Sequence, residues 1–261
     1  MLDYLFGRIN KILERLRAAE RLFLFLDFDG TLTSIVSHPE EARLSDEMKG
    51  LLLDLKKNGK ILLAILSGRS LNDIRRRVGL RGIYYVGNHG LEIFQPKQGR
   101  ESLVPNKMID ALGGIRDRLH HQFRNIEGVF IEDKGYVLAV HYRNVDPRCV
   151  PPILMGVKGE IKNSMAPLCL GLGKYVFEVR PKSVVNKGIA VLALLDRADQ
   201  GGTLPIYIGD DQTDEDAFRA LRRKGITVLV GLPRLSSARY YVEDPSEVFQ
   251  FLKIIQKEVR S

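Results

Sequence analysis

Short segments made almost only of apolar residues recur along this chain, and they constrain its fold more than any other feature. The predicted strands of this kind are Leu22 to Leu26, Ile61 to Leu66, Ile83 to Val86 and Leu204 to Ile208. A continuous apolar run of this length is typical of a strand buried on both faces. Segments with helical spacing lie between them, for example from Ser45 to Lys57 and from Ser70 to Val78. This alternation predicts an α/β protein with a parallel sheet covered by helices on both faces.

The rhythm changes between residues 105 and 179. Helices are predicted over 106–123 and 151–165, and two pairs of short strands over 129–142 and 168–179. No helix separates the members of a pair, so the sheet formed by these strands is expected to be antiparallel. We therefore predict an inserted α+β domain over 105–179.

After Pro181 the first rhythm returns, with further strands and helices predicted over 186–195, 214–223, 226–230, 240–242 and 245–259. The predicted core is Rossmann-like and consists of residues 21–104 and 180–261. An insert of about 70 residues is a plausible size for a small domain.

Residues 1–20 are expected to form an amphipathic helix that packs on the protein, and a membrane-surface anchor is the alternative. This segment lacks the continuous apolar region of a secretory signal, and no apolar run is long enough for a membrane span. Cys149 and Cys169 have no metal-binding or CxxC spacing, so ordinary thiols and a cytoplasmic location are favoured.

The net charge of +8 raises the alternative of nucleic-acid binding. Basic residues are nevertheless interleaved with acidic ones along the whole chain, and no basic stripe rich in aromatic residues occurs. A solubilising surface, or one that attracts a small anionic substrate, is therefore favoured over a nucleic-acid partner.

Polar groups follow three of the apolar strands. Asp27 and Asp29 come after the first, Ser67 after the second, and an acidic cluster of Asp210, Asp211 and Asp214 after the strand at 204–208. Lys187 lies at the start of a helix that follows the insert. Since ligands of open α/β sheets bind beyond the carboxyl ends of the strands, these groups are expected at one edge of the sheet.

Each group alone has a simpler interpretation as a turn, a helix cap or a solvated side chain. Their joint occurrence after apolar strands favours a functional site. Carboxylates gathered in one place repel one another, which raises their pKa values, and turns or helix caps do not explain why the chain would gather them. A divalent cation relieves that repulsion, and oxygen ligands of this kind suit Mg²⁺.

The order of these motifs resembles that of haloacid dehalogenase-type phosphatases, whose larger cap lies between the second and third motifs. Several stretches more narrowly resemble the trehalose-phosphatase family. They are 27–31 with His38-Pro39, Ser67-Gly68-Arg69-Ser70, Gly87-Asn88-His89-Gly90-Leu91-Glu92, Glu178-Val179-Arg180-Pro181, Asn186-Lys187-Gly188 and 209–218. The resemblance extends from about Arg21 to the end of the chain.

The resemblance implies a role for each residue of the core motifs. Asp27 would be the nucleophile that forms an aspartyl-phosphate, and Asp29 the general acid and base. Ser67 and Lys187 would bind the phosphoryl oxygens. Mg²⁺ would be held by Asp27, the backbone carbonyl of Asp29 and Asp210. Asp214 would hold Lys187 or a metal-bound water.

It also implies that the insert recognises a sugar phosphate. Hydrogen bonds to sugar hydroxyls are expected from three of its residues, and phosphate or hydroxyl contacts from two others. The first group is Glu132, Lys134 and Glu178, and the second is Arg143 and Lys174. Gly68, Arg69 and Asn88 are the expected substrate contacts of the core. Val176 stands where some relatives carry a second lysine, so the sugar contacts follow the family less closely than the catalytic groups do.

Trehalose 6-phosphate is the expected substrate, and association with a trehalose-phosphate synthase the expected partnership. Sucrose-phosphate, mannosyl-phosphoglycerate and phosphomannose enzymes of the same superfamily are the nearest alternatives. A non-catalytic binding module on this fold is the alternative from another class, although all four motif positions carry residue types competent for catalysis.

Overall fold

The computed structural model describes residues 2–34, 36, 39–182, 185–198 and 201–260. His38 of the sequence motif lies outside these residues. The chain divides into two compact units, one of residues 1–103 with 185–261 and one of residues 104–184. Each unit has a sheet and a hydrophobic core of its own.

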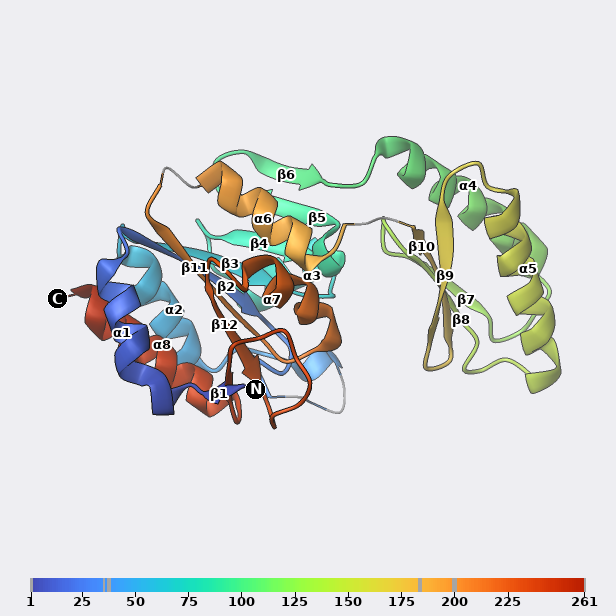
Figure 1. Cartoon of the computed structure of the whole chain (residues 1–261). Helices are drawn as coiled ribbons and strands as arrows, with labels where there is room; N and C mark the ends of the chain where they lie inside the picture. The colour runs from blue at the N-terminus through green and yellow to red at the C-terminus, as the bar shows by residue number, and fades with distance from the viewer. Residues whose placement is uncertain (1, 35, 37–38, 183–184, 199–200, 261) are drawn as a thin grey trace. The chain divides into compact units, whose positions relative to one another are not determined.

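The larger unit is built on a nine-stranded sheet in the order β1-β13-β12-β11-β2-β3-β4-β5-β6 (Figure 1). Its strands are β1 (Asp3–Tyr4), β2 (Arg21–Asp27), β3 (Ile61–Leu66), β4 (Tyr84–Gly87), β5 (Glu92–Gln95), β6 (Gly99–Ser102), β11 (Thr203–Gly209), β12 (Ile226–Val230) and β13 (Tyr240–Val242). Strand β2 pairs in parallel with β3 on one side and with β11 on the other. The chain order therefore reverses at β2, which is where open α/β sheets bind their ligands.

Helices cover both faces of this sheet, as the sequence predicts (Figure 1). The helices α1 (Ile9–Ala18), α2 (Asp46–Lys57), α3 (Leu71–Val78) and α8 (Pro245–Arg260) lie on one face, and α6 (Lys187–Ala198) and α7 (Glu215–Leu221) on the other. Residues 22–26 of β2 are all apolar because both faces of the strand are buried. Leu22, Leu24 and Leu26 pack in the core on the side of α1, α2, α3 and α8, whereas Phe23 and Phe25 pack in the core on the side of α6 and α7. Among the described residues, no helix is long and apolar enough to cross a bilayer.

The sheet is parallel over most of its strands, as predicted, but it is antiparallel at one edge. The strands β4, β5 and β6 form an antiparallel meander, and no strand was expected between Gly87 and Asn106. The residues of β5 and β6 are Glu-Ile-Phe-Gln and Gly-Arg-Glu-Ser, so neither is a continuous apolar run. Antiparallel edge strands need no crossover helix, so the strand–helix rhythm does not reveal them.

The smaller unit packs two helices against a four-stranded antiparallel sheet of order β7-β8-β10-β9. Its elements are α4 (Asn106–Phe123), β7 (Phe130–Asp133), β8 (Leu138–His141), α5 (Val150–Asn163), β9 (Leu168–Gly173) and β10 (Val176–Pro181). The predicted two helices and two hairpins are confirmed. Ile131, Val140 and Phe177 share the helix side of the sheet. The opposite side carries the polar residues Glu132, His141 and Glu178 together with Phe130 and Val176.

The N-terminal segment is an integral part of the larger unit. Strand β1 extends the sheet beside β13, with Asp3 opposite Tyr240. Helix α1 buries Ile12 and Leu16 in the core that it shares with α8. The expected amphipathic helix is therefore present, but it begins at Ile9 and is preceded by a short strand.

Truncation of Ile12 should reveal how much stability this segment contributes. Because Ile12 is fully buried, Ile12→Ala is expected to lower the free energy of unfolding by about 2 to 5 kcal/mol. Urea denaturation of the full chain measures the loss. The control is Glu14→Ala, which changes an exposed residue of the same helix and should stay within about 0.5 kcal/mol of the wild type. Equal losses for the two variants would mean that α1 is not docked on the core.

Candidate active site

Three carboxylates converge at the carboxyl ends of β2 and β11. One oxygen each of Asp27, Asp210 and Asp214 lies within 4.8 Å of the other two. Asp27 ends β2, and Asp210 follows the neighbouring strand β11 directly. The parallel pairing of these strands therefore brings together groups that are more than 180 residues apart, as the sequence predicts.

Lys187 is the cation of this cluster. Its Nζ atom lies 2.6 Å from Asp27 Oδ1 and 2.7 Å from Asp214 Oδ1, and the residue is 2% exposed. Burial alone would lower the pKa of Lys187, but the adjacent carboxylates raise it above its ordinary value. Burial, together with the carboxylates of Asp214 and Asp210, raises the pKa of Asp27 despite the ammonium group. The cluster thus carries three carboxylates for one ammonium.

Asp214 has partners on both of its oxygens. Besides Lys187, Oδ1 accepts a hydrogen bond of 2.6 Å from the hydroxyl of Tyr207, and Oδ2 accepts one of 2.9 Å from the backbone N–H of Asp211. Burial and the Asp214 carboxylate raise the pKa of Tyr207 well above its ordinary value, so this phenol stays a donor. Tyr207 was not among the predicted site residues. Its hydroxyl in an otherwise apolar strand, three residues before Asp210, is the signal that could have found it.

Asp210 is held by contacts from two loops. Its side chain lies against Gly30, where an added Cβ would come within 2.2 Å of Oδ2, and Thr31 donates to Oδ1 at 3.2 Å. Arg234 donates to the backbone carbonyl of Asp210 at 2.5 Å. Burial, followed by the Asp214 carboxylate, raises the pKa of Asp210 to about 6. Neither Thr31 nor Arg234 was predicted as a site residue.

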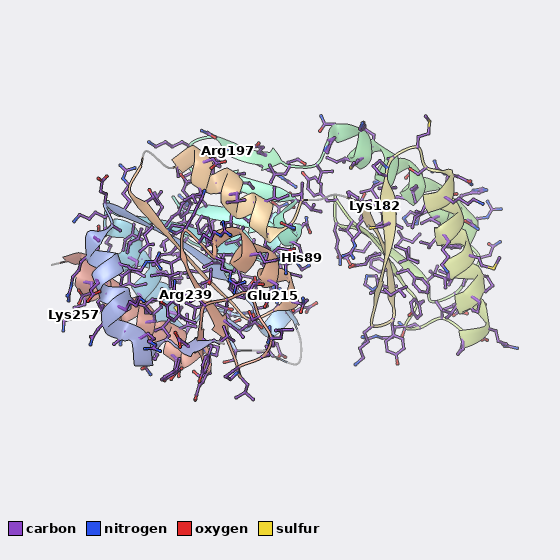
Figure 2. All side chains as sticks on the ribbon, in the orientation of Figure 1. His89, Lys182, Arg197, Glu215, Arg239 and Lys257 are labelled. Carbon is purple, nitrogen blue, oxygen red and sulfur yellow. The ribbon has the colours of Figure 1, made fainter. Side chains whose placement is uncertain are left out.

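The loop that carries Arg234 is anchored by Glu215 at the start of α7, which is labelled in Figure 2. The buried Glu215 accepts a hydrogen bond of 2.7 Å from the backbone N–H of Ser237, on the same loop. Two contacts thus join this loop to the acidic cluster and its helix.

Asp29 faces a different partner from Asp27. Its carboxylate binds the guanidinium of Arg69 through both oxygens, with a shortest distance of 2.6 Å, and Ser67 Oγ lies 3.4 Å away. The Asp29 side chain keeps 44% of its surface exposed, whereas Asp27 is almost fully buried. Arg69, predicted as a substrate contact, is therefore also the residue that orients Asp29.

The segment Gly87 to Gly90 lies beside Ser67 and Arg69. The backbone N–H of Asn88 donates to the Arg69 carbonyl at 2.8 Å, and Asn88 itself is 3% exposed. Its side-chain amide donates to the buried carboxylate of Glu92 at 2.5 Å. The predicted substrate contact Asn88 therefore has a structural partner inside the core.

In the smaller unit, three of the predicted residues lie together on the polar side of the sheet. Glu132 and Glu178 are in register across β8, and Lys134 Nζ lies 3.6 Å from Glu178 and 3.9 Å from Glu132. His141, not among the predicted site residues, contacts Glu132 at 3.0 Å. Arg143 and Lys174 are exposed in the turns at the other end of the hairpins, where Arg143 lies over the Tyr175 ring.

The acidic cluster fits a divalent cation by its chemistry. Three carboxylates against one ammonium leave an excess of negative charge in a buried place, and hard oxygen ligands suit Mg²⁺. Burial, together with the neighbouring carboxylates, raises the pKa of both Asp27 and Asp210. Both oxygens of Asp214 already accept hydrogen bonds, from Lys187 and Tyr207 on Oδ1 and from the Asp211 N–H on Oδ2, so Asp27 and Asp210 are the better metal ligands.

Comparison with known proteins identifies the family of this chain. The family model described as Trehalose-phosphatase matches residues 25–246. Probable trehalose-phosphate phosphatase 4 of Oryza sativa subsp. japonica is 35% identical over 89% of this chain, and trehalose-phosphate phosphatase B of Arabidopsis thaliana is 33% identical over 94%. The chain spans about two thirds of the length of these relatives, 65% and 69% respectively. The structure of Aspergillus fumigatus trehalose-6-phosphate phosphatase matches with a TM-score of 0.72 and 26% identity, covering 98% of this chain and 99% of that one.

Removal of the Lys187 charge should destabilise the protein in a pH-dependent way. Lys187→Met leaves buried carboxylates without their cation and is expected to cost about 3 to 5 kcal/mol at pH 7.5. A carboxyl group whose pKa is raised by folding contributes stability that is present at low pH and lost as the pH rises through the folded pKa. The loss should therefore be smaller at pH 5 than at pH 7.5.

Urea denaturation at the two pH values measures this difference. The matched control is Lys224→Met, which removes an exposed lysine of the same unit and should cost less than about 0.5 kcal/mol at both. A loss for Lys187→Met that is independent of pH would contradict the proposed charge balance.

Proposed function

We propose that this chain, which belongs to the trehalose-phosphatase family, hydrolyses trehalose 6-phosphate to trehalose and phosphate. Its relatives indicate a phosphoric monoester hydrolase. The observation that carries the proposal is the pairing of a buried carboxylate, Asp27, with Lys187, next to a more exposed carboxylate, Asp29. Two carboxylates in such different surroundings can perform different tasks in one reaction.

Asp27 acts as the nucleophile. Its carboxylate attacks phosphorus, the bond between phosphorus and the sugar oxygen breaks, and Asp29 gives its proton to the departing oxygen. Asp29 then takes a proton from the water that attacks the aspartyl-phosphate, which releases phosphate and restores Asp27. The exposure of Asp29, and its hold by Arg69 and Ser67, suit a group that must meet both the sugar and water.

Lys187 and Ser67 stabilise the phosphoryl group. The Lys187 ammonium, placed between Asp27 and Asp214, offers positive charge where an anionic phosphoryl group must approach an anionic nucleophile. Ser67 is 1% exposed and lies next to Asp29, so its hydroxyl adds a donor on the same side. Asp214 and Tyr207 keep the lysine in place.

Mg²⁺ is the proposed cofactor, with the carboxylates of Asp27 and Asp210 and the backbone carbonyl of Asp29 as its ligands. When bound, it supplies positive charge that offsets the repulsion between the phosphoryl group and the carboxylates. Asp214 holds Lys187 or a water molecule on the cation.

The unit of residues 104–184 is the proposed cap and supplies the sugar contacts. Glu132, Lys134 and Glu178 form one group of donors and acceptors suited to sugar hydroxyls. Arg143 and Lys174 offer cations to the phosphate or a nearby hydroxyl. Gly68, Arg69 and Asn88 are the proposed substrate contacts of the larger unit. The side-chain amide of Asn88 also donates a hydrogen bond to Glu92.

A cytoplasmic location and association with a trehalose-phosphate synthase complete the proposal. Cys149 and Cys169 are free thiols, which fits a reducing compartment. Joint purification of the two proteins from cells would test the association.

A panel of sugar phosphates assayed with Mg²⁺ tests the function. Trehalose 6-phosphate should be hydrolysed with a higher kcat/KM than sucrose 6-phosphate, mannosyl-phosphoglycerate, mannose phosphate or p-nitrophenyl phosphate. Asp27→Asn should reduce turnover by a factor of about 10³ or more because the nucleophile is lost. Circular dichroism shows whether that variant is folded, and mass spectrometry excludes deamidation. If trehalose 6-phosphate were turned over no faster than p-nitrophenyl phosphate, the substrate assignment would be wrong.

Binding of Mg²⁺ should weaken as the pH falls. Protons compete with the cation for Asp210, whose pKa is raised to about 6, so the increase in Tm caused by Mg²⁺ should be larger at pH 7.5 than at pH 5. Thermal unfolding with MgCl₂, compared with NaCl of equal ionic strength, measures this effect without any substrate. Asp210→Asn should lose the metal-dependent part of the increase. A larger Mg²⁺ effect at pH 5 would contradict the ligand assignment.

A further inference from the structure

The segment Asn88–His89–Gly90 has an unusual backbone. Its three residues have φ angles of 49°, 55° and 111° in succession. Positive φ is ordinary for glycine but uncommon for other residues, and each such residue costs free energy that its surroundings must offset. Such strain is concentrated at functional sites, so the way in which this segment is held shows what it positions.

Hydrogen bonds from two sides hold the segment. The backbone N–H groups of Asn88 and His89 donate to the carbonyls of Arg69 and Ser67, at 2.8 and 3.2 Å. From the core side, the Asn88 amide donates to Glu92, a carboxylate that is 1% exposed and also paired with Arg100. The segment is thus bonded directly to the loop that carries Ser67 and Arg69.

The result of this arrangement is the position of the His89 imidazole. A Cβ atom added to Gly68 would lie 2.4 Å from His89 Cε1 and 2.6 Å from Nε2, so the ring occupies the space that a side chain at Gly68 would need. His89 nevertheless remains exposed (Figure 2, where it is labelled). A strained backbone, a buried carboxylate and a glycine together present an exposed imidazole above the Ser67–Gly68–Arg69 loop.

This position matters because of what Ser67 and Arg69 contact. Both have hydrogen bonds to Asp29, the carboxyl group that serves the departing oxygen in the proposed reaction. The imidazole therefore lies over the peptide between the two residues that orient this acid. An imidazole offers a donor and an acceptor to neighbouring hydroxyl groups.

We propose that His89 contacts the leaving group of the substrate, the hydroxyl-rich part released when the bond to phosphorus breaks. The inference rests on the proposed phosphatase function and adds a specificity residue on the core side of the site. A purely structural role, in which the ring only packs on Gly68, is the competing explanation.

The test compares two substrates whose leaving groups differ. For His89→Ala, kcat/KM for trehalose 6-phosphate should fall about 10-fold more than for p-nitrophenyl phosphate, whose leaving group has no sugar hydroxyls, and mainly through KM. His89→Gln should restore part of the loss because its amide can donate and accept. His121→Ala, an exposed histidine of α4, is the control and should change neither substrate. Equal losses for both substrates, or no loss for either, would overturn the proposal.

Gly68→Ala provides a second test, because its Cβ must displace the imidazole. If it acts through His89, its selective loss with trehalose 6-phosphate should be largely absent in the His89→Ala background. Additive losses would show that the ring position is not what matters. Failure of the proposed function is seen separately, as a wild-type protein that does not turn over trehalose 6-phosphate; failure of this inference is seen only in the variants.

Discussion

The structure of the site depends on one electrostatic constraint: three carboxylates share one buried ammonium. Asp27 is the last residue of β2, Lys187 is the first residue of α6, and Asp214 lies in the turn before α7. A buried charge that loses its partner is costly, so each of these segments must be in place for the others to be tolerated. The excess negative charge that remains makes the place attractive to a cation. Burial, followed by the Asp214 carboxylate, raises the pKa of Asp210 to about 6. Structure and proposed chemistry therefore have the same electrostatic origin.

Close approach of the backbone is the second condition for this cluster. Gly30 has a φ of 82° and lies so near the Asp210 carboxylate that any side chain would collide with it. Gly209 has the same relation to Asp214, whose Cγ atom would be 2.4 Å from an added Cβ. The glycines beside the aspartates thus make room for the carboxylates.

The elements that follow a simple periodicity are predictable from the amino-acid sequence. The strands β2, β3 and β11 and the helices α2 and α4 lie within a residue or two of the predicted positions, because burial on both faces or on one face leaves a clear apolar pattern. The strands β5 and β6, which are short and partly polar, and β1, which has only two residues, were not predicted. Their pairing is decided by neighbouring strands, so no local pattern marks them.

The same distinction holds for the site. Topology predicted that Asp27, Lys187 and Asp210 would meet, because the ends of parallel strands share an edge. Spacing could not predict that Tyr207 donates to Asp214 or that Arg69 binds Asp29, because both contacts depend on side-chain direction in three dimensions. The position of the His89 ring could not be predicted for the same reason, because it depends on the buried carboxylate of Glu92 and on Gly68, which is distant in sequence.

The docking of the N-terminal segment has a consequence for the order of folding. Asp3 pairs with Tyr240, and Arg17 forms an ion pair with Glu258, so both partners of the segment lie more than 230 residues further along the chain. During synthesis, residues 3–18 can reach these native contacts only after residues 240–258 have been made. Contacts between such distant residues form slowly, since the entropy of closing the intervening loop must be overcome first. Until then, the apolar side of α1 has no native partner, which leaves apolar surface on the nascent chain that promotes aggregation.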